Sequence, residues 1–160
     1  MNFLLIGRPN VGKSSIYNIL TTGEKNIIHY EEGTTRDWHK NNVTKYNNII
    51  IYDTPGVIIQ NNKINKFGFT KLFDLVDKFI YVIDYKLKNF ETDIQSLNIL
   101  RVFNKEIILV VNKDDNNEQN INIKLFGVKN FFFISCAHKL GIDEIYNYFK
   151  QFNNNRLINK

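Results

Sequence analysis

Gly-Arg-Pro-Asn-Val-Gly-Lys-Ser, at residues 7–14, is the stretch of this sequence that decides the fold. It follows an apolar run at residues 3–6 and leads into residues 15–20, whose apolar side chains recur at helical spacing. A strand, a glycine-rich loop and a helix in this order predict a phosphate-binding loop. Gly7 and Gly12 let the backbone curl, so that successive N–H groups converge on one phosphate at the helix N-terminus.

Two side chains of this stretch have an expected chemical role. Lys13 would reach the β- and γ-phosphates of a nucleotide, and the Ser14 hydroxyl would hold Mg²⁺. The alternative is an ordinary turn, in which Gly12 is a cap and Lys13 is a surface lysine. The residues that we expect around the phosphates are Asn10, Val11, Gly12, Lys13, Ser14 and Ser15.

Length and composition indicate one globular domain. The chain has 160 residues, a mass of 18.9 kDa and 43% hydrophobic residues, which suffices for one sizeable core. We expect the domain to span residues 1–153, with residues 154–160 a frayed tail or the start of a linker to a missing domain. The apolar runs are far shorter than the ~20 residues that span a bilayer, so we expect no membrane segment. We also expect a monomer.

The start of the chain and its cysteine content predict a cytoplasmic location, and its net charge bears on possible partners. Residues 3–6 already belong to an expected core strand, so we expect no signal peptide. The single Cys136 cannot form an internal disulfide and fits a reducing compartment. The net charge of +5 permits a polyanionic partner such as RNA. The lysines are scattered, however, and a nucleotide-composition bias of the source genome explains them equally well.

Strands and helices alternate along the rest of the chain. We expect a surface loop at residues 21–30, a hairpin turn at 46–47 and a mobile polar segment at 60–66. The expected strands are 3–6, 42–45, 48–52, 79–84, 107–111 and 131–134, and the expected helices are 15–20, 69–76, 89–103, a short one at 121–126, and 143–152. This alternation predicts an α/β fold, a three-layer sandwich with a mostly parallel six-stranded sheet. The polar motifs fall at strand ends, where parallel sheets bind ligands.

One such motif is Asp-Thr-Pro-Gly at residues 53–56. The Asp53 carboxylate at a strand end would bind Mg²⁺ through water, and the Gly56 N–H would contact the γ-phosphate and so sense its loss. The alternative is a common turn, since Asp, Pro and Gly all favour turns.

Thr34 and Thr35 lie in the preceding loop and offer hydroxyls that would complete Mg²⁺ coordination only when the γ-phosphate is present. A loop ordered in this way acts as a switch. A threonine in a loop can equally be no more than a turn residue.

Asn-Lys-Asp-Asp at residues 112–115 is the motif that discriminates best after the glycine-rich loop. The Asp115 carboxylate can accept from both N1–H and the exocyclic amine of guanine, which adenine does not offer. An unpaired buried acceptor costs about 1–3 kcal/mol, which is enough for a strong base preference. The Asn112 amide would brace the pocket, and the Lys113 stem would cover the base. The alternative is a solvated turn at a strand end.

Ser135, Cys136 and Ala137 would close the base pocket, with the Cys136 N–H donating to guanine O6. The alternative is that Cys136 is simply a small buried residue. This interpretation is compatible with an N–H that donates to guanine. His29 and His39 have no cysteine or carboxylate at ligand spacing, so we expect no metal site from them. We interpret His138 as a surface residue.

In this order the motifs resemble the translation-factor-like GTPases of the TrmE-Era-EngA group, which includes Era, the tRNA-modification GTPase MnmE and EngA (Der). The resemblance is carried by residues 7–14, Gly-Thr-Thr-Arg-Asp at 33–37, Asp-Thr-Pro-Gly at 53–56 and Asn-Lys-x-Asp at 112–115. Residues 134–143 look most like the first, N-terminal GTPase domain of EngA. The resemblance implies a P-loop NTPase with a Ras-like G domain that hydrolyses GTP to GDP in assembly of the large ribosomal subunit. EngA has two such domains and a KH-like domain, so this chain is an excised domain or a single-domain relative.

The resemblance also implies catalytic roles for Lys13, Asn10, Thr35 and Gly56. Asn10 would contribute to a K⁺ site between the phosphates, with the backbone near His29 and Glu31 and the Thr34 hydroxyl completing it. Thr35 would be the Mg²⁺ threonine, beside Ser14 and Asp53. Val57 stands where Ras-like enzymes have a water-orienting glutamine, so slow intrinsic hydrolysis is expected. The sequence departs from the group at Glu31-Glu32-Gly33, in place of a proline-containing stretch, and at Asn65-Lys66, where MnmE has an acidic residue.

These observations favour a Mg²⁺-dependent, K⁺-stimulated GTPase whose loops at 24–37 and 54–68 control docking on a ribosomal particle or rRNA. The alternatives are a guanine-nucleotide-dependent binding module with negligible turnover, or an Era-like or MnmE-like single G domain. A further alternative, an ATP-dependent kinase, requires residues 112–115 to be an idle turn.

Overall fold

The structure is a computed structural model, which describes the backbone of residues 1–21, 27–30, 37–53, 59–60, 63–64 and 70–158. Within these ranges it describes the side chains of residues 1–21, 39–53, 72–153.

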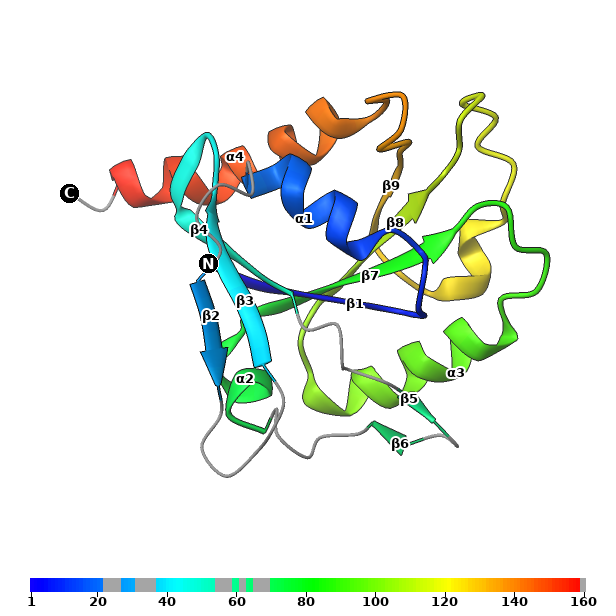
Figure 1. The fold of residues 1–160 in the computed structure, drawn as a ribbon, viewed down its shortest axis with the longest axis horizontal. Helices are drawn as coiled ribbons and strands as arrows, with labels where there is room; N and C mark the ends of the chain where they lie inside the picture. The colour runs from blue at the N-terminus through cyan, green and yellow to red at the C-terminus, as the bar shows by residue number, and fades with distance from the viewer. Residues whose placement is uncertain (22–26, 31–36, 54–58, 61–62, 65–69, 159–160) are drawn as a thin grey trace.

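The described residues form an α/β fold built on one mixed sheet (Figure 1). Its strand order is β2-β3-β4-β1-β7-β8-β9. The strands are β1 (Asn2–Gly7), β2 (Ile27–Tyr30), β3 (Asp37–Val43), β4 (Tyr46–Asp53), β5 (Ile59–Gln60), β6 (Lys63–Ile64), β7 (Lys78–Asp84), β8 (Ile107–Asn112) and β9 (Asn130–Phe133). The helices are α1 (Lys13–Thr21), α2 (Thr70–Leu75), α3 (Glu91–Leu100) and α4 (Ile142–Ile158), with 3-10 turns η1 (Arg101–Phe103) and η2 (Ile123–Phe126).

The predicted α/β class and mostly parallel sheet are confirmed, but the sheet has seven strands rather than six. Strands β4, β1, β7, β8 and β9 are parallel to one another, while β3 is antiparallel to both β4 and β2. The additional strand is β2, which falls in the segment expected to be a surface loop. Its pairing with β3 supplies the backbone hydrogen bonds, and no period within the segment itself signals that pairing.

Further boundaries differ from the sequence-based expectations. Strand β3 begins at Asp37, whereas the sequence predicted a strand at residues 42–45. The hairpin turn between β3 and β4 lies at residues 44–45 instead of 46–47, because Tyr46 pairs with Val43 next to a register shift. Residues 59–60 and 63–64 pair as the two short strands β5 and β6 within the segment expected to be irregular. Helix α4 continues to Ile158, six residues beyond its expected end at Phe152. The assignment of residues 154–160 as a tail or a linker stays a prediction.

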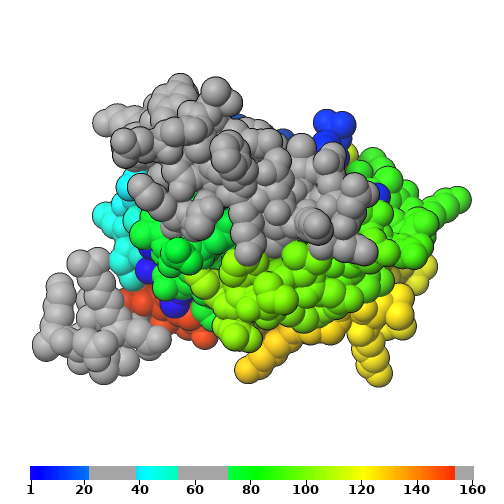
Figure 2. Space-filling model, turned by 90° about the horizontal axis from the view of Figure 1, so that it is seen from below, coloured from blue at the N-terminus to red at the C-terminus, as the bar shows by residue number. Residues whose placement is uncertain are grey.

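Helices cover both faces of the sheet and create two cores. Figure 1 shows α1 and α4 on one face and α2 and α3 on the other. Figure 2 looks onto the second face, where α3 lies across the middle as a yellow-green band. Successive side chains of a strand point to opposite faces of the sheet, so those of β1 alternate between the two cores. Phe3 and Leu5 pack under α1 and α4, while Leu4 and Ile6 pack toward α3.

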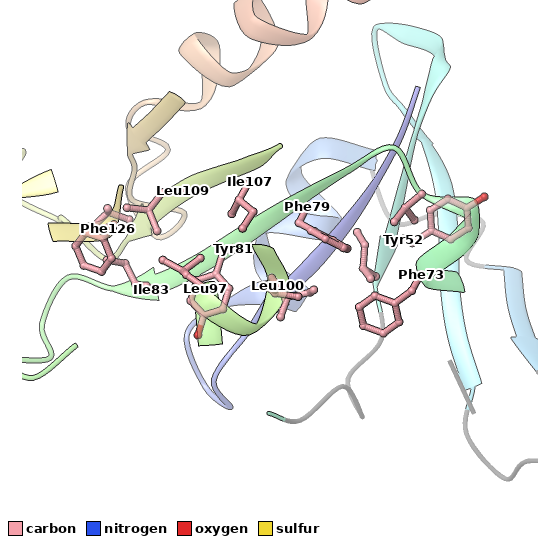
Figure 3. Close-up of a cluster of buried hydrophobic side chains, with 14 of the residues drawn as sticks. Tyr52, Phe73, Phe79, Tyr81, Ile83, Leu97, Leu100, Ile107, Leu109 and Phe126 are labelled. Atoms are coloured by element: carbon pink, nitrogen blue, oxygen red, sulfur yellow. The ribbon is translucent and has the colours of Figure 1, made fainter. Parts of the chain in front are cut away.

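The central strands are apolar along almost their whole length because they are covered on both faces. All six residues of β8 are buried, as are six of the seven residues of β7. Figure 3 shows the core under α3, where Tyr81, Leu97 and Leu100 meet. Burying each such side chain contributes about 1.5–3 kcal/mol, so these two strands anchor the sheet.

Strand direction places the functional motifs at one edge of the sheet. The carboxyl ends of β1, β4, β7, β8 and β9 point the same way, because all five strands are parallel. The chain passes from β1 to β4 on one side and then to β7 on the other, so the sequence order reverses at β1. Ligands of open α/β sheets bind at such a switch point. Among the described residues no helix combines the length and the apolarity needed to cross a bilayer.

Candidate functional site

The glycine-rich loop leaves β1 and turns directly into α1. Helix α1 begins at Lys13, and its first turn is closed by a 3.0 Å bond from the Ile16 N–H to the Gly12 carbonyl. Gly12 has a φ of +99°, and a Cβ atom there would lie 2.2 Å from Asn112 Nδ2. Asn10 also has a positive φ, of 65°, which asparagine tolerates better than most residues. The loop therefore turns its backbone N–H groups toward the N-terminal end of α1.

Lys13 is held within the loop that carries it. Its Nζ donates to the carbonyls of Gly7 at 2.9 Å and Arg8 at 3.2 Å. An ammonium group has three N–H donors, so one remains beyond these two bonds. Burial lowers the pKa of Lys13, and the negative charge of Asp53 opposes that shift. The charge of Lys13 therefore lies at the mouth of the loop, where an anion would compensate for its burial.

A hollow of about 500 Å³ opens over the loop. Asp53, the last residue of β4, is 5% exposed and lies in its wall, while the hydroxyl residues Ser14 and Ser15 are exposed at the start of α1. Burial and the charge of Asp53 together raise the pKa of Tyr17 to about 12. The lining residues are Pro9, Asn10, Gly12, Lys13, Ser14, Ser15, Asp53 and Lys113. The structure thus brings two predicted magnesium ligands, Ser14 and Asp53, to one hollow.

Asn112 and Lys113 fasten the end of β8 to the glycine-rich loop. The Asn112 Nδ2 group donates to the Val11 carbonyl at 3.0 Å, and its Oδ1 accepts from the Cys136 N–H at 3.2 Å. Lys113 has a φ of 70°, and its Nζ donates to the Asn10 carbonyl at 2.8 Å. The buried Asn112 side chain therefore joins three loops that follow different strands.

Asp115 lies at the other end of this motif with its carboxylate held from two sides. Oδ1 accepts from the Ser135 hydroxyl at 2.6 Å, and Oδ2 pairs with Lys86 Nζ at 2.8 Å. The hydrogen bonds from Lys86 and Ser135 lower the pKa of Asp115, so this carboxyl is ionised at neutral pH. A carboxylate has about four acceptor positions, and these contacts use two of them. The remaining two match the number of donors on the guanine edge.

The Cys136 N–H donates to the side chain of Asn112, at Oδ1. Its expected bond to guanine O6 stays a prediction. The carbonyl oxygen of the buried amide satisfies this N–H, because a buried donor needs an acceptor. Cys136 is half-buried rather than buried, and this partial burial raises the pKa of its thiol to about 11. Ala137 is exposed beside it.

A second hollow, of about 620 Å³, adjoins the first, because Lys113 lines both. It is formed by the loops after β7 and β8. Its lining residues are Tyr85, Lys86, Leu87, Lys88, Phe90, Lys113, Asp115, Asn116, Glu118, Asn120 and Ile121. Together the two hollows run from Lys13 to Asp115, along the edge where the parallel strands end.

Several predicted site residues lie outside the part of the chain that the structure describes. They are Glu31, Thr34, Thr35, Gly56 and Val57, with most of the loops at 24–37 and 54–68. The side chain of His29 lies outside it as well. Within the described ranges no three His, Cys, Asp or Glu side chains gather into a metal-binding group. A hydroxyl and one carboxylate nevertheless suit Mg²⁺, which keeps several waters and binds phosphate oxygens.

Sequence reasoning missed three ionic contacts at this edge. Arg8 of the loop pairs with Asp93 of α3, Lys86 pairs with Asp115, and Asp84 pairs with Lys113 at 3.1 Å. Apart from Asp93, which lies within α3, these are charged residues at or just after a strand end, a pattern that is also common on solvated surfaces.

A family model described as 50S ribosome-binding GTPase matches residues 2–113 of this chain. Among curated proteins, the GTPase Der of Campylobacter jejuni strain 81-176 is 34% identical over 160 residues, covering 94% of this chain and 34% of the relative. The GTPase Der of Campylobacter fetus is 36% identical over 151 residues, covering 89% of this chain and 32% of the relative. The chain therefore spans about a third of the length of these relatives.

Solved structures support the fold. A GDP-bound mutant of NFeoB from S. thermophilus superposes with a TM-score of 0.74 at 21% identity, covering 92% of this chain and 59% of the other. The cytosolic domain of the T. maritima FeoB iron transporter, in a GDP form, superposes with a TM-score of 0.71 at 25% identity, covering 95% of this chain and 62% of the other.

Proposed function

Because the chain belongs to the family of 50S ribosome-binding GTPases, we propose that it binds GTP and hydrolyses it to GDP and phosphate. The observation that carries this proposal is the position of Asp115. Its carboxylate is ionised, held by Ser135 and Lys86, and retains two acceptor positions beside a hollow that continues to Lys13.

The phosphates would bind over the glycine-rich loop. The N–H groups at the start of α1 have no partner within the helix and carry a partial positive charge, which favours an anion there. Lys13 would direct its third N–H to a phosphate oxygen while it keeps its bonds to Gly7 and Arg8. Its lowered pKa is no obstacle, because a bound phosphate favours the charged form of the amine.

Two cations complete the proposed site. Ser14, Asp53 and Thr35 would hold Mg²⁺, and Asn10 would contribute an oxygen to K⁺. When bound, these ions would neutralise charge that develops on the β- and γ-phosphate oxygens. Asn10 is exposed at the hollow, and Lys113 holds its carbonyl through a 2.8 Å hydrogen bond, so its side chain remains available for a ligand.

The base would lie against the stem of Lys113 with its edge toward Asp115. N1–H and the exocyclic amine of guanine would occupy the two remaining acceptor positions of that carboxylate. Guanine O6 would face the loop of Ser135, Cys136 and Ala137, where the 3.2 Å bond from Cys136 to Asn112 is long enough to be shared. Adenine offers an acceptor at N1, which would face the carboxylate charge, so guanine should bind far better.

Base selectivity tests this proposal. The native chain should bind GDP at least about 100-fold more tightly than ADP in a calorimetric competition, because adenine leaves Asp115 unsatisfied. Asp115→Asn should lose GDP affinity and gain affinity for xanthosine diphosphate, since the amide can donate to the C2 carbonyl of xanthine. Asp74→Asn changes an exposed aspartate of α2 and is the matched control. Equal affinity of the native chain for GDP and ADP would contradict the proposal.

Slow turnover is the second element of the proposed function, because Val57 cannot orient a water molecule as glutamine does. A guanine-nucleotide-dependent binding module with negligible turnover is the alternative that this valine favours. Single-turnover hydrolysis by the isolated chain separates the two. Rates should be higher in KCl than in NaCl, and equal rates would remove Asn10 and K⁺ from the mechanism.

A ribosomal particle or its RNA is the proposed partner, with the chain acting as a cytoplasmic nucleotide switch. The family description and the Der relatives support this partner, as does the net charge of +5. The chain spans about a third of the length of those relatives, whose other parts could carry contacts of their own. The test therefore uses this chain alone. Cosedimentation with large ribosomal subunits should be greater with a non-hydrolysable GTP analogue than with GDP. Binding that ignores the nucleotide would contradict a switch.

A further inference from the structure

Arg8 of the glycine-rich loop, whose side chain is 29% exposed, forms an ion pair with the buried carboxylate of Asp93 in α3. Asp93 is fully buried, and its Oδ1 and Oδ2 accept from Arg8 Nε at 3.2 Å and Nη2 at 2.5 Å. Tyr81 of β7 donates its hydroxyl to Asp93 Oδ1 at 2.8 Å. Figure 3 shows Tyr81 within the apolar cluster of this face, beside Leu97 and Leu100. The carboxylate therefore sits where water cannot replace a lost partner.

The same arginine holds the loop at a second point. Arg8 Nη2 donates to the Asn89 carbonyl at 3.0 Å, just before α3 begins. The planar guanidinium fork can bind a carboxylate and a carbonyl together, which a lysine ammonium does not do with the same geometry. Arg8 thus fixes the first half of the loop against two positions on the opposite face of the sheet from α1.

This anchor acts on the residue expected to contact the phosphates. The Arg8 carbonyl is one of the two acceptors that hold Lys13 Nζ, and the Gly7 carbonyl next to it is the other. Fixing the Arg8 side chain therefore fixes the backbone on which Lys13 rests. A loop ordered before binding loses less conformational entropy when the ligand arrives.

We propose that the Arg8–Asp93 pair, with Tyr81, is a positioning device that sets the affinity of the glycine-rich loop for the β-phosphate of a nucleotide. The inference rests on the proposed nucleotide function and assigns that function three further residues besides the glycines, lysine and serine of the phosphate-binding motif. The pair does not contact the nucleotide. It acts through the backbone of residues 7 and 8, so it should affect nucleoside diphosphates more than monophosphates.

The ratio of the dissociation constants for GMP and GDP measures this effect, because GMP lacks the β-phosphate. In Arg8→Met and in Asp93→Asn the ratio should fall by about tenfold relative to the native chain, with GMP affinity little changed. Lys78→Met is the matched control. It breaks the Lys78–Glu106 ion pair, which joins the amino ends of β7 and β8 at the far end of the sheet. This control should lower stability but leave the ratio unchanged.

A triple variant separates positioning from mere stability. Removing one partner leaves an uncompensated buried charge, whereas replacing the whole network by apolar residues is much less destabilising. The variant Arg8→Met, Asp93→Leu, Tyr81→Phe should therefore unfold at higher denaturant concentration than Arg8→Met, yet keep the low GMP-to-GDP ratio. A return of the ratio to the native value would overturn the proposal. An Arg8→Met variant that still binds GDP and keeps the native GMP-to-GDP ratio would overturn it as well. Either result would leave the proposed nucleotide function standing. Failure of the native chain to bind GDP would overturn both.

Discussion

At the scale of single residues, the site depends on backbone positions that tolerate little change. Gly12 combines a positive φ with the closest approach of the loop to Asn112, whose amide links Val11 to Cys136. Any side chain at residue 12 would have to displace that amide. The same contact joins the phosphate part of the site to the base part.

Gly12→Ala should abolish nucleotide binding and lower the free energy of unfolding. The φ of +99° costs an L residue about 1–2 kcal/mol, and the clash with Asn112 Nδ2 adds to that. Gly127→Ala is the control, because Gly127 also has a positive φ but ends η2, away from the hollows, and its Cβ would meet only the end of the Arg101 side chain. It should lose stability and keep GDP binding, measured by urea unfolding and by fluorescence titration. GDP binding by Gly12→Ala at native affinity would contradict the assigned loop geometry.

At the scale of elements, a polar cluster at the far end of the sheet fixes how three elements meet. Glu106, just before β8, accepts hydrogen bonds from Lys78 of β7, Asn130 of β9 at 2.6 Å and Tyr148 of α4 at 3.4 Å. Burial raises the pKa of Glu106, but the hydrogen bonds from Lys78 and Asn130 outweigh it, so its pKa lies below 4.5. The ionised form is therefore the one that joins β7, β9 and α4.

Glu106→Gln should lower the free energy of unfolding at neutral pH and should make that free energy less dependent on pH in the acid range. A depressed folded-state pKa contributes stability above the unfolded value of 4.5, and this stability is lost as the pH falls through the lower folded value. The native chain should thus lose stability faster than the variant below pH 4.5, in urea unfolding at pH 3 to 7. Glu118→Gln, at an exposed glutamate, is the control. Parallel pH profiles for Glu106→Gln and the native chain would contradict this role.

At the scale of the whole molecule, the site is a meeting of residues from the carboxyl ends of five strands. Asp53 at the end of β4 and residues after β1, β7, β8 and β9 line or brace the two hollows, and helices pack on both faces of those strands. A ligand bound across these residues stabilises every element that carries them, because the unfolded chain has no such site.

GDP should therefore raise the unfolding temperature of the entire domain in one transition. At a free concentration of 100 times the dissociation constant, the stabilisation is about 2.7 kcal/mol. ADP at the same concentration should give about 0.4 kcal/mol or less, since a 100-fold weaker ligand is then near its own dissociation constant. Removal of Mg²⁺ with EDTA should reduce the GDP effect, because Ser14 and Asp53 are the proposed ligands of the ion. Differential scanning calorimetry measures the shift, with Asp115→Asn as the variant that should not respond to GDP. An equal shift with ADP would contradict base selection by Asp115.

The order of elements and the chemistry at the strand ends could be predicted from local patterns. The glycine-rich loop has a fixed spacing between a strand and a helix, and the motif at residues 112–115 follows an apolar run whose length marks a buried strand. Each of these signals is local, because all of its residues are close neighbours in the chain. Sequence alone therefore determined the α/β class, the order of the helices and of the strands other than β2, β5 and β6, and the residues expected at the nucleotide site.

Only the tertiary structure decided which distant residues meet. The Arg8–Asp93 pair joins residues 85 positions apart, and Asn112 reaches Val11 across 101 positions. Strand β2 likewise exists through its pairing with β3, and Lys86 reaches Asp115 because parallel β7 and β8 end side by side. These contacts depend on which strands become neighbours and in which register, and the free energy of that choice comes from the whole core rather than from any one segment.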